Sequence, residues 1–140
     1  MQKLCFVVVG KIKEAFYRDA VAEYVKRLSR FAKVEIKELP EAEAGEILRA
    51  MKGYTIALAV EGEKASSESL AARLKKLCDE GREVTFVIGS SCGLSDRVKN
   101  AADWRLSFSD MTFPHQLMRV ILAEQVYRAF MINGGGTYHK

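Results

Sequence analysis

The stretch FVIGSSCGL, residues 86–94, begins with an apolar run and ends in a glycine turn. An apolar run of this length, stopped by glycine, predicts a buried β-strand followed by a tight loop. Apolar runs and amphipathic segments alternate in this way along all 140 residues. Alternation with short links predicts an α/β fold with a largely parallel sheet, and the length suits one domain over residues 1–140.

The alternation predicts five strands and five helices. We expect strands at residues 4–9, 33–39, 54–60, 84–88 and 105–109. We expect helices at about 14–31, 41–52, 66–80, 95–102 and 114–132. The last helix is apolar around most of its circumference, which favours a homodimer over burial within one subunit. The glycine-rich tail, residues 133–140, is expected to be flexible.

Composition excludes several classes of protein. The chain is 49% hydrophobic and 29% charged, as in a globular domain, and its net charge of +4 is compatible with an anionic partner. The first ten residues are too short for a membrane span and lack a cleavage pattern, so we expect a cytoplasmic protein without a membrane segment. Neither a disulfide framework nor a metal site is expected from the few cysteines and histidines: Cys5, Cys78, Cys92, His115 and His139.

The loop at residues 89–93 also matches the G-x-S-x-G spacing of a hydrolase nucleophile elbow. A serine hydrolase would use Ser91, with an acid and a histidine later in the chain: Asp103 or Asp110, and His115 or His139. The chain is short for that fold and has no glycine-rich oxyanion loop. The hydrolase is therefore kept as the alternative, and a reactive thiol at Cys92 ranks below it.

The same residues also suit a ligand-binding turn, which does not require a catalytic triad. Ligands of parallel sheets bind beyond the carboxyl ends of the strands. Loops at 61–63, 89–94 and 110–113 follow three of the predicted strands, and they form one pocket if those strands are neighbours. The chain has no G-x-G-x-x-G and no phosphate-loop motif, so NAD and nucleoside triphosphates are not supported. Adenosine held by main-chain atoms and apolar side chains remains possible.

The C-terminal part carries a specific resemblance. The stretches LSFSDMTFPHQLMRV (106–120) and EQVYRA (124–129), with the ending YHK (138–140), closely resemble the small SPOUT-class methyltransferases that modify a pseudouridine in 23S ribosomal RNA. The resemblance spans the chain and includes VVGKIKE (8–14), EYVKRL (23–28) and VIG (87–89). Two features depart from the family: Ser90 stands where a second glycine is usual, and the segment between residues 40 and 54 is short.

The resemblance implies a homodimeric α/β fold with a C-terminal trefoil knot, within about residues 54–140. It implies that S-adenosylmethionine binds in the knot and donates a methyl group to N3 of a pseudouridine in 23S rRNA of the large subunit. The positions that would bind this cofactor are Leu58, Gly89, Phe108, Ser109, Asp110, Met111, Thr112 and Phe113.

Methylation of N3 requires loss of a proton from an imide nitrogen. We expect His139 to be the base and Tyr138 to stack on or orient the target ring, although both residues also suit the anchoring of a chain terminus. Arg119, Arg128 and Lys140 are candidates for phosphate contacts. Pairing of Arg128 with Glu124 is an equally good interpretation for that arginine. A non-catalytic RNA-binding module is the third interpretation of the chain.

Overall fold

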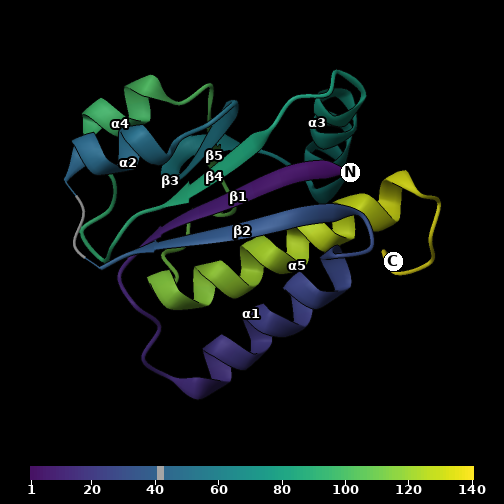
Figure 1. Cartoon of the computed structure of the whole chain (residues 1–140), viewed down its shortest axis with the longest axis horizontal. Helices are drawn as coiled ribbons and strands as arrows, with labels where there is room; N and C mark the ends of the chain where they lie inside the picture. The colour runs from purple at the N-terminus through teal and green to yellow at the C-terminus, as the bar shows by residue number, and fades with distance from the viewer. Residues whose placement is uncertain (41–42) are drawn as a thin grey trace.

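A computed structural model describes residues 1–40 and 43–140 as a five-stranded sheet between two layers of helices (Figure 1). The strand order is β2-β1-β4-β3-β5, and every strand pair in the sheet is parallel. The predicted α/β class is confirmed. The elements are β1 (Gln2–Val9), α1 (Ala15–Leu28), β2 (Ala32–Leu39), α2 (Ala44–Ala50), β3 (Tyr54–Lys64), α3 (Ser67–Asp79), β4 (Val84–Ile88), α4 (Asp96–Ala101), β5 (Trp104–Ser107) and α5 (His115–Asn133).

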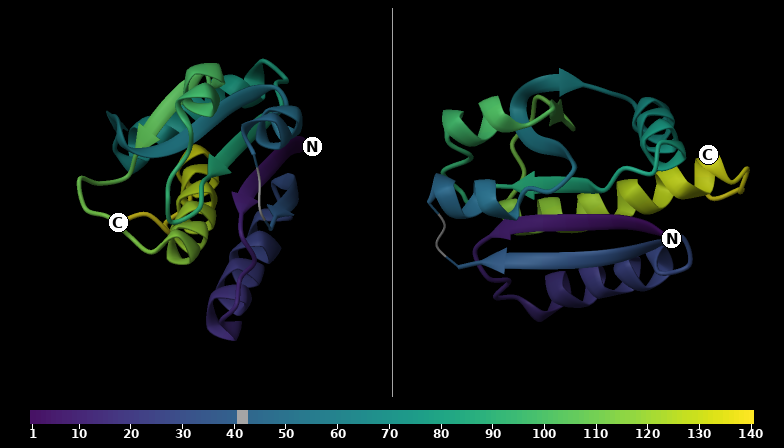
Figure 2. Two further views of the ribbon diagram at one scale, coloured as in Figure 1. Left: turned by 90° about the vertical axis from the view of Figure 1, so that its left-hand side faces the viewer. Right: turned by 45° about the horizontal axis from the view of Figure 1, so that its top comes forward.

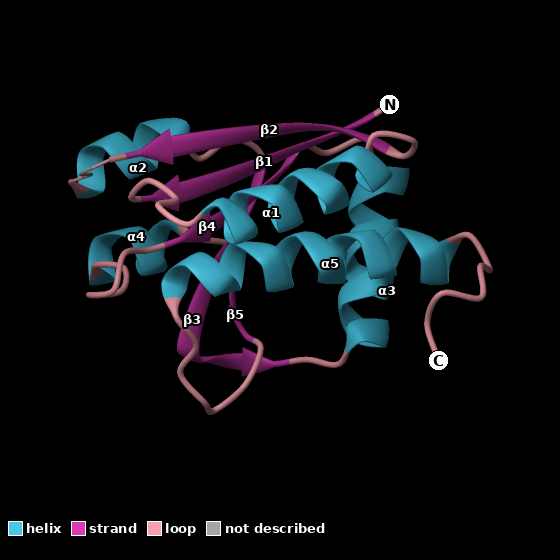
Figure 3. Ribbon diagram, turned by 90° about the horizontal axis from the view of Figure 1, so that it is seen from below, coloured by secondary structure: helices cyan, strands magenta, loops and turns pink. Residues whose placement is uncertain are grey.

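The two faces of the sheet pack against different helices. Alternate side chains of a strand point to opposite faces. On β1, Phe6 and Val8 therefore join a core with α1, α3 and α5, whereas Val7 and Val9 join a second core with α2 and α4. Figure 3 shows the first of these faces, with α1 and α5 running across the sheet. Burial on both faces explains why β1 and β4 are continuous apolar runs.

Several predicted boundaries differ from the structure, among them the last strand, which was predicted to run to residue 109 and ends at Ser107. The strand predicted to stop at residue 60 continues to Lys64, so the expected loop at 61–63 belongs to β3. The pattern gave no sign of this because Glu61, Glu63 and Lys64 are polar residues on a strand segment that is largely exposed. The helix predicted from residue 41 is α2, which begins at Ala44, and residues 41 and 42 lie outside the described part of the chain.

The last helix and the tail are more closely packed with the rest of the chain than expected. Helix α5 lies against α1, α3 and the sheet, and its innermost apolar side chains, Leu122, Ala123, Val126 and Ala129, are buried. The other apolar side chains of α5, including Ile121 and Tyr127, are only half-buried. The tail, expected to be flexible, folds back through hydrogen bonds from the amides of Gly134 and Gly136 to carbonyls of the last helical turn.

No helix within residues 1–40 and 43–140 has the length and apolar character needed to cross a membrane.

Candidate functional site

The middle of β3, from Leu58 to Glu61, meets the segments that follow β4 and β5 at the carboxyl edge of the sheet. Figure 2 shows this edge from the front in its left panel. Because β3 lies between β4 and β5, the three segments are neighbours, which is the condition under which the sequence predicted one pocket. They surround a cavity of about 560 Å³. That volume is within the range of small-molecule sites. Seven of the eight predicted cofactor residues line it: Leu58, Gly89, Phe108, Ser109, Met111, Thr112 and Phe113.

The turn after β4 forms the floor of the cavity and requires its glycines. A Cβ atom on Gly89 would lie 2.7 Å from the carbonyl carbon of Gly93, which is closer than real contacts allow. Gly93 has a φ of +79°, and its amide donates a 2.8 Å hydrogen bond to the Ser90 carbonyl. No residue other than glycine has a positive φ in the described part of the chain. Ser90 therefore occupies its position without backbone strain.

The wall formed by β3 results from an irregularity in its pairing with β5. Leu58 pairs with Leu106, and Glu63 pairs with the same residue, so the backbone between them bulges out of the ladder. Ala59, Val60 and Glu61 in this bulge line the cavity. A Cβ atom on Gly62 would lie 2.7 Å from the carbonyl oxygen of Arg105, so glycine permits the close approach of the two strands.

The turn between β5 and α5 closes the cavity through its own hydrogen bonds. The Ser107 hydroxyl donates to the Ser109 carbonyl at 3.0 Å, and the Met111 amide donates to the Ser109 hydroxyl at 3.0 Å. Met111 is 72% exposed although it lines the cavity, so it lies at the mouth. Asp110 is the predicted cofactor residue outside the lining, and its carboxylate pairs instead with Lys64.

The first turn of α5 adds residues that the sequence did not assign to the pocket. His115 and Met118 both line the cavity. The signal for the place of His115 in the pocket was its position shortly after the predicted loop at residues 110–113.

The tail residues lie at the other end of α5 (Figure 1). The Tyr138 hydroxyl donates a 2.7 Å hydrogen bond to Glu124, and the Arg128 guanidinium donates one of 2.6 Å to the same oxygen. Nδ1 of His139 lies 2.9 Å from Arg128, and Nε2 lies 2.6 Å from the carboxylate of Glu68. Arginine only donates, so Nδ1 accepts and Nε2–H donates to Glu68.

Burial and hydrogen bonding change the acidity of two groups in this cluster. Burial, together with the hydrogen bond to Glu124, raises the pKa of the Tyr138 hydroxyl well above its ordinary value. Burial alone would raise the pKa of Glu124, but the hydrogen bonds from Arg128 and Tyr138 outweigh it, and the net shift is downward. Glu124 is therefore a carboxylate at neutral pH, and Tyr138 is a neutral donor.

Comparison with known proteins identifies the family. The family model described as a predicted SPOUT methyltransferase matches residues 2–139. The chain belongs to the SPOUT methyltransferase family. Curated SPOUT relatives include a protein of Levilactobacillus brevis, 48% identical over 96% of this chain and 98% of its own length, and one of Lactobacillus acidophilus, 47% identical over 96% and 97%. Both are named ribosomal RNA large subunit methyltransferase H.

Solved structures agree with this SPOUT assignment at the level of the fold. A putative methylase family protein from Neisseria gonorrhoeae has a TM-score of 0.60 at 13% identity, covering 90% of this chain and 82% of its own. A putative RNA methyltransferase from Bacillus anthracis has a TM-score of 0.51 at 18% identity, covering 97% and 99%. At these identities the likeness concerns the arrangement of helices and strands.

The SPOUT family implies S-adenosylmethionine as the methyl donor, and the residues at the carboxyl edge fit this molecule. The cavity combines apolar walls with the exposed main chain of the turn at 89–93, where glycine leaves room for close approach. Apolar walls with a few main-chain hydrogen-bonding groups are typical of sites for a nucleoside. No three His, Cys, Asp or Glu side chains of the described residues gather as a metal site would require.

The hydrolase alternative lacks its supporting contacts in this SPOUT domain. Asp103 accepts a 2.8 Å hydrogen bond from the amide of Thr55 at the opposite edge of the sheet, and Asp110 pairs with Lys64. Ser91 and His115 line the same cavity, but within residues 1–40 and 43–140 no hydrogen bond joins Ser91 to a histidine. A nucleophile without a base does not make the required triad.

The three predicted RNA-contacting cations have different environments. Arg119 is 4% exposed, and its guanidinium is occupied by Glu38 and by the carbonyls of Val9 and Gly10. It therefore has no surface to offer a phosphate. Arg128 is partly exposed and pairs with Glu124, as the helix-support interpretation predicted. Lys140 is exposed at the chain end.

Proposed function

We propose that this protein transfers a methyl group from S-adenosylmethionine to N3 of a pseudouridine in 23S rRNA of the large ribosomal subunit. The supporting observation is the cavity at the carboxyl edge, built from the strand ends that the family resemblance assigns to the cofactor. The curated relatives are named for methylation of large-subunit ribosomal RNA and match nearly the whole chain. An enzyme acting on ribosomes belongs in the cytoplasm.

The cofactor, when bound, supplies a methyl group already activated on a sulfonium. The protein then has to position the acceptor nitrogen and remove its proton. Leu58, Gly89 and the turn at residues 108–113 would hold the adenosyl donor through apolar contacts and main-chain hydrogen bonds. Asp110 remains part of this assignment through a rearrangement of its pair with Lys64, since it is not among the residues that line the cavity.

His139 is the proposed base, and Tyr138 would orient or stack on the target ring. The two contacts of His139 fit a neutral imidazole, in which Nδ1 accepts and Nε2–H donates. A neutral imidazole is the form that accepts a proton. The lone pair on Nδ1, which would take the proton, accepts a hydrogen bond from Arg128. The imidazole must therefore separate from Arg128 before it takes the N3 proton. This separation releases Nη1 of Arg128 for an RNA phosphate, while Nε and Nη2 stay paired with Glu124.

The distance between the cavity and the tail supports a homodimeric, composite site. Helix α5 has 19 residues, which corresponds to a length of about 28 Å between its two ends. His139 of one subunit would therefore act at the cavity of the other, brought there by a two-fold contact through the half-buried apolar side chains of α5. The trefoil knot of the family would lie within about residues 54–140. Arg128 and Lys140 would contact RNA at the composite site, and the target base would leave its stack.

Methyl transfer to ribosomes from a strain lacking this gene tests the function. We expect one labelled nucleoside in 23S rRNA, identified by mass as N3-methylpseudouridine. A titration with S-adenosylmethionine alone should show one site per subunit. Cofactor binding without methyl transfer, or a methyl group on another nucleoside, would contradict the proposed reaction. Labelling of Ser91 by a fluorophosphonate would instead support the hydrolase.

A further inference from the structure

The loop between β1 and α1, residues 10–14, is a second structured element at the carboxyl edge. It has the sequence GKIKE, with one lysine on each side of Ile12. The β1 strand pairs with β4, with Val8 opposite Ile88, so Gly10 lies beside the turn that forms the cavity floor. A Cβ atom on Gly10 would be 4.0 Å from Nε2 of His115, a residue that lines the cavity. The loop therefore borders the proposed methyl-transfer site.

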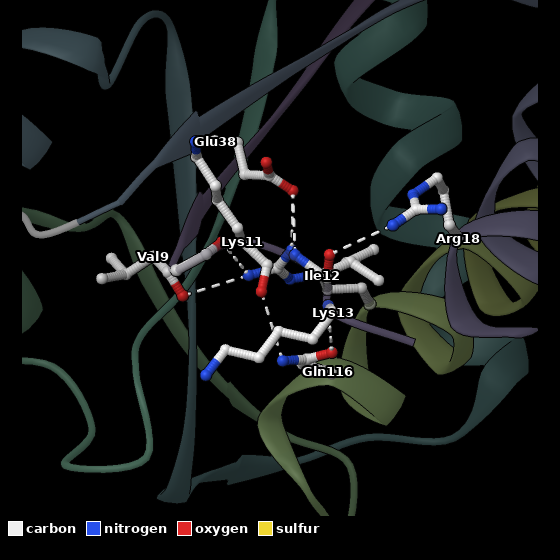
Figure 4. Close-up of polar contacts among 9 residues, drawn as sticks. Val9, Lys11, Ile12, Lys13, Arg18, Glu38 and Gln116 are labelled. Atoms are coloured by element: carbon white, nitrogen blue, oxygen red, sulfur yellow. Dashed lines mark hydrogen bonds and ion pairs between the residues drawn. The ribbon is translucent and has the colours of Figure 1, made fainter. Parts of the chain in front are cut away.

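Side chains from three elements hold the backbone of this loop (Figure 4). Gln116 of α5 accepts from the Lys13 amide at 3.3 Å and donates to the Lys11 carbonyl at 3.2 Å. Glu38 of β2 accepts from the Ile12 amide at 3.4 Å, and Arg18 of α1 donates to the Ile12 carbonyl at 3.4 Å. The loop is thus attached to the first turn of α5, directly beside the cavity.

Arg119 explains why these contacts converge. Its buried guanidinium donates to the carbonyls of Val9 and Gly10 and pairs with Glu38 at 3.1 Å. Glu38 in turn receives the Ile12 amide. One arginine from α5 therefore fixes both the end of β1 and the carboxylate that holds the loop. The role of Arg119 is to position the loop, and the loop itself presents the exposed cations.

The side chains of Lys11 and Lys13 are exposed. Among residues 1–40 and 43–140, no carboxylate lies within ion-pair distance of the ammonium group of Lys11 or Lys13. The nearby carboxylate of Glu38 is already paired with Arg119. The arrangement is a fixed backbone with two unpaired positive charges beside the proposed acceptor site. Because RNA carries one phosphate per nucleotide, such cations suit the backbone of the nucleotides next to the target.

We propose that Lys11 and Lys13 contact RNA phosphates flanking the methylated nucleotide, and that Arg119 and Gln116 hold the loop in the orientation for this contact. The inference rests on the proposed function, because it assumes an RNA substrate at the cavity. It assigns the loop to substrate binding rather than to cofactor binding or to the chemical step. Charge removal should therefore raise KM for ribosomes and leave kcat and the affinity for S-adenosylmethionine near their original values.

The test is the salt dependence of ribosome binding by Lys11→Ala/Lys13→Ala. Each phosphate contact contributes about a threefold change in affinity between 50 and 200 mM salt, so losing two contacts should reduce the total change about tenfold. The matched control is Lys3→Ala/Lys33→Ala. It removes the same charge from two lysines that lie opposite each other in the register of β1 and β2, at the other edge of the sheet. Lys11→Arg/Lys13→Arg should retain the original salt dependence.

Two results separate the possible failures. Methyl transfer by the original protein, with the same salt dependence in the Lys11/Lys13 alanine variant as in the Lys3/Lys33 control, would overturn the loop contact alone. Ribosome binding that depends on Lys11 and Lys13, without any methyl transfer by the original protein, would contradict the proposed function and support the loop contact.

Discussion

The two ends of α5 differ in the groups that they bring together. At the N-terminal end, His115 and Met118 line a cavity suited to the cofactor, and Arg119 is buried among main-chain carbonyls. At the C-terminal end, Tyr138 and His139 form a polar cluster with Glu124 and Glu68. One end has a binding pocket and the other has the proposed base. Under the proposed function neither end is sufficient by itself, and the difference is the reason why the proposal assigns the site to two subunits.

The largest expected effect concerns the proposed base. His139→Ala should lower kcat about 10²- to 10⁴-fold, the usual contribution of a general base, while the affinity for S-adenosylmethionine stays near normal. Single-turnover methyl transfer and equilibrium cofactor binding measure the two quantities. An unchanged rate would show that His139 takes no part in the reaction, and would contradict the proposal that the two ends of α5 have different roles.

Mixed dimers refine this prediction. A Gly89→Val subunit should lack a usable pocket, and a His139→Ala subunit should lack the base. If each tail serves the cavity of the partner, equal mixing should restore about a quarter of the original activity, since half of the dimers are mixed and each has one complete site. If each tail serves its own cavity, mixing should restore nothing.

Loss of an arginine should lower stability by different amounts at the two ends of α5. Arg119→Ala leaves the Glu38 carboxylate and two carbonyls without a donor, and should cost about 3 kcal/mol in the free energy of unfolding. Arg128→Ala removes a more exposed ion pair and should cost about 1 kcal/mol. Urea unfolding measures both. Equal costs would show that the buried network is no more important to the fold than the tail cluster.

The turn under the cavity should be sensitive to a single methyl group. Gly89→Ala places a Cβ atom 2.7 Å from the Gly93 carbonyl carbon, and the forced shift should cost about 2 kcal/mol in cofactor binding, roughly 30-fold in Kd. Cys92→Ala, in the same loop but exposed and outside the cavity lining, is the control and should bind normally. Isothermal titration with S-adenosylmethionine provides the measurement.

The smallest expected effect is the pH dependence of tail docking. The folded-state pKa of Glu124 is lowered, so its contribution to stability is complete above about pH 4.3, the ordinary value for glutamate, and is lost as pH falls through the lower folded-state pKa. The expected contribution is about 1 kcal/mol. The difference in unfolding free energy between the original protein and Glu124→Gln should shrink below about pH 4. A constant difference would contradict the assignment.

The sequence was a good guide wherever burial leaves a periodic pattern. Continuous apolar runs located β1 and β4, and the serines that precede α3 and α4 marked both helix starts, with Ser66 and Ser95 accepting from amides in the first turn. Parallel strands place the loops that follow them at one edge of the sheet, which predicted a pocket there on the condition that the strands are neighbours. The individual residues Leu58, Gly89 and Phe108 came from the family resemblance, and the strand order β4-β3-β5 meets the condition.

The features that the sequence missed depend on partners distant in the chain. Arg119 looks like any surface arginine, and its burial follows from Glu38, 81 residues away, and from the carbonyls that end β1. The extension of β3 to Lys64 depends on its second pairing with β5. The tail has a composition typical of a flexible end, yet Glu68 and Glu124 hold it in place. Local patterns contain no information on such contacts.

The double pairing of Leu106 separates the constraint on the sheet from the constraint on the cavity wall. Because Leu58 and Glu63 both reach the same residue of β5, the intervening backbone is surplus length that the ladder does not use. A residue inserted or deleted there alters the pocket wall while the flanking strand pairs persist. Changes in the length of this bulge therefore alter the shape of the proposed cofactor cavity and leave the pairing of the sheet intact.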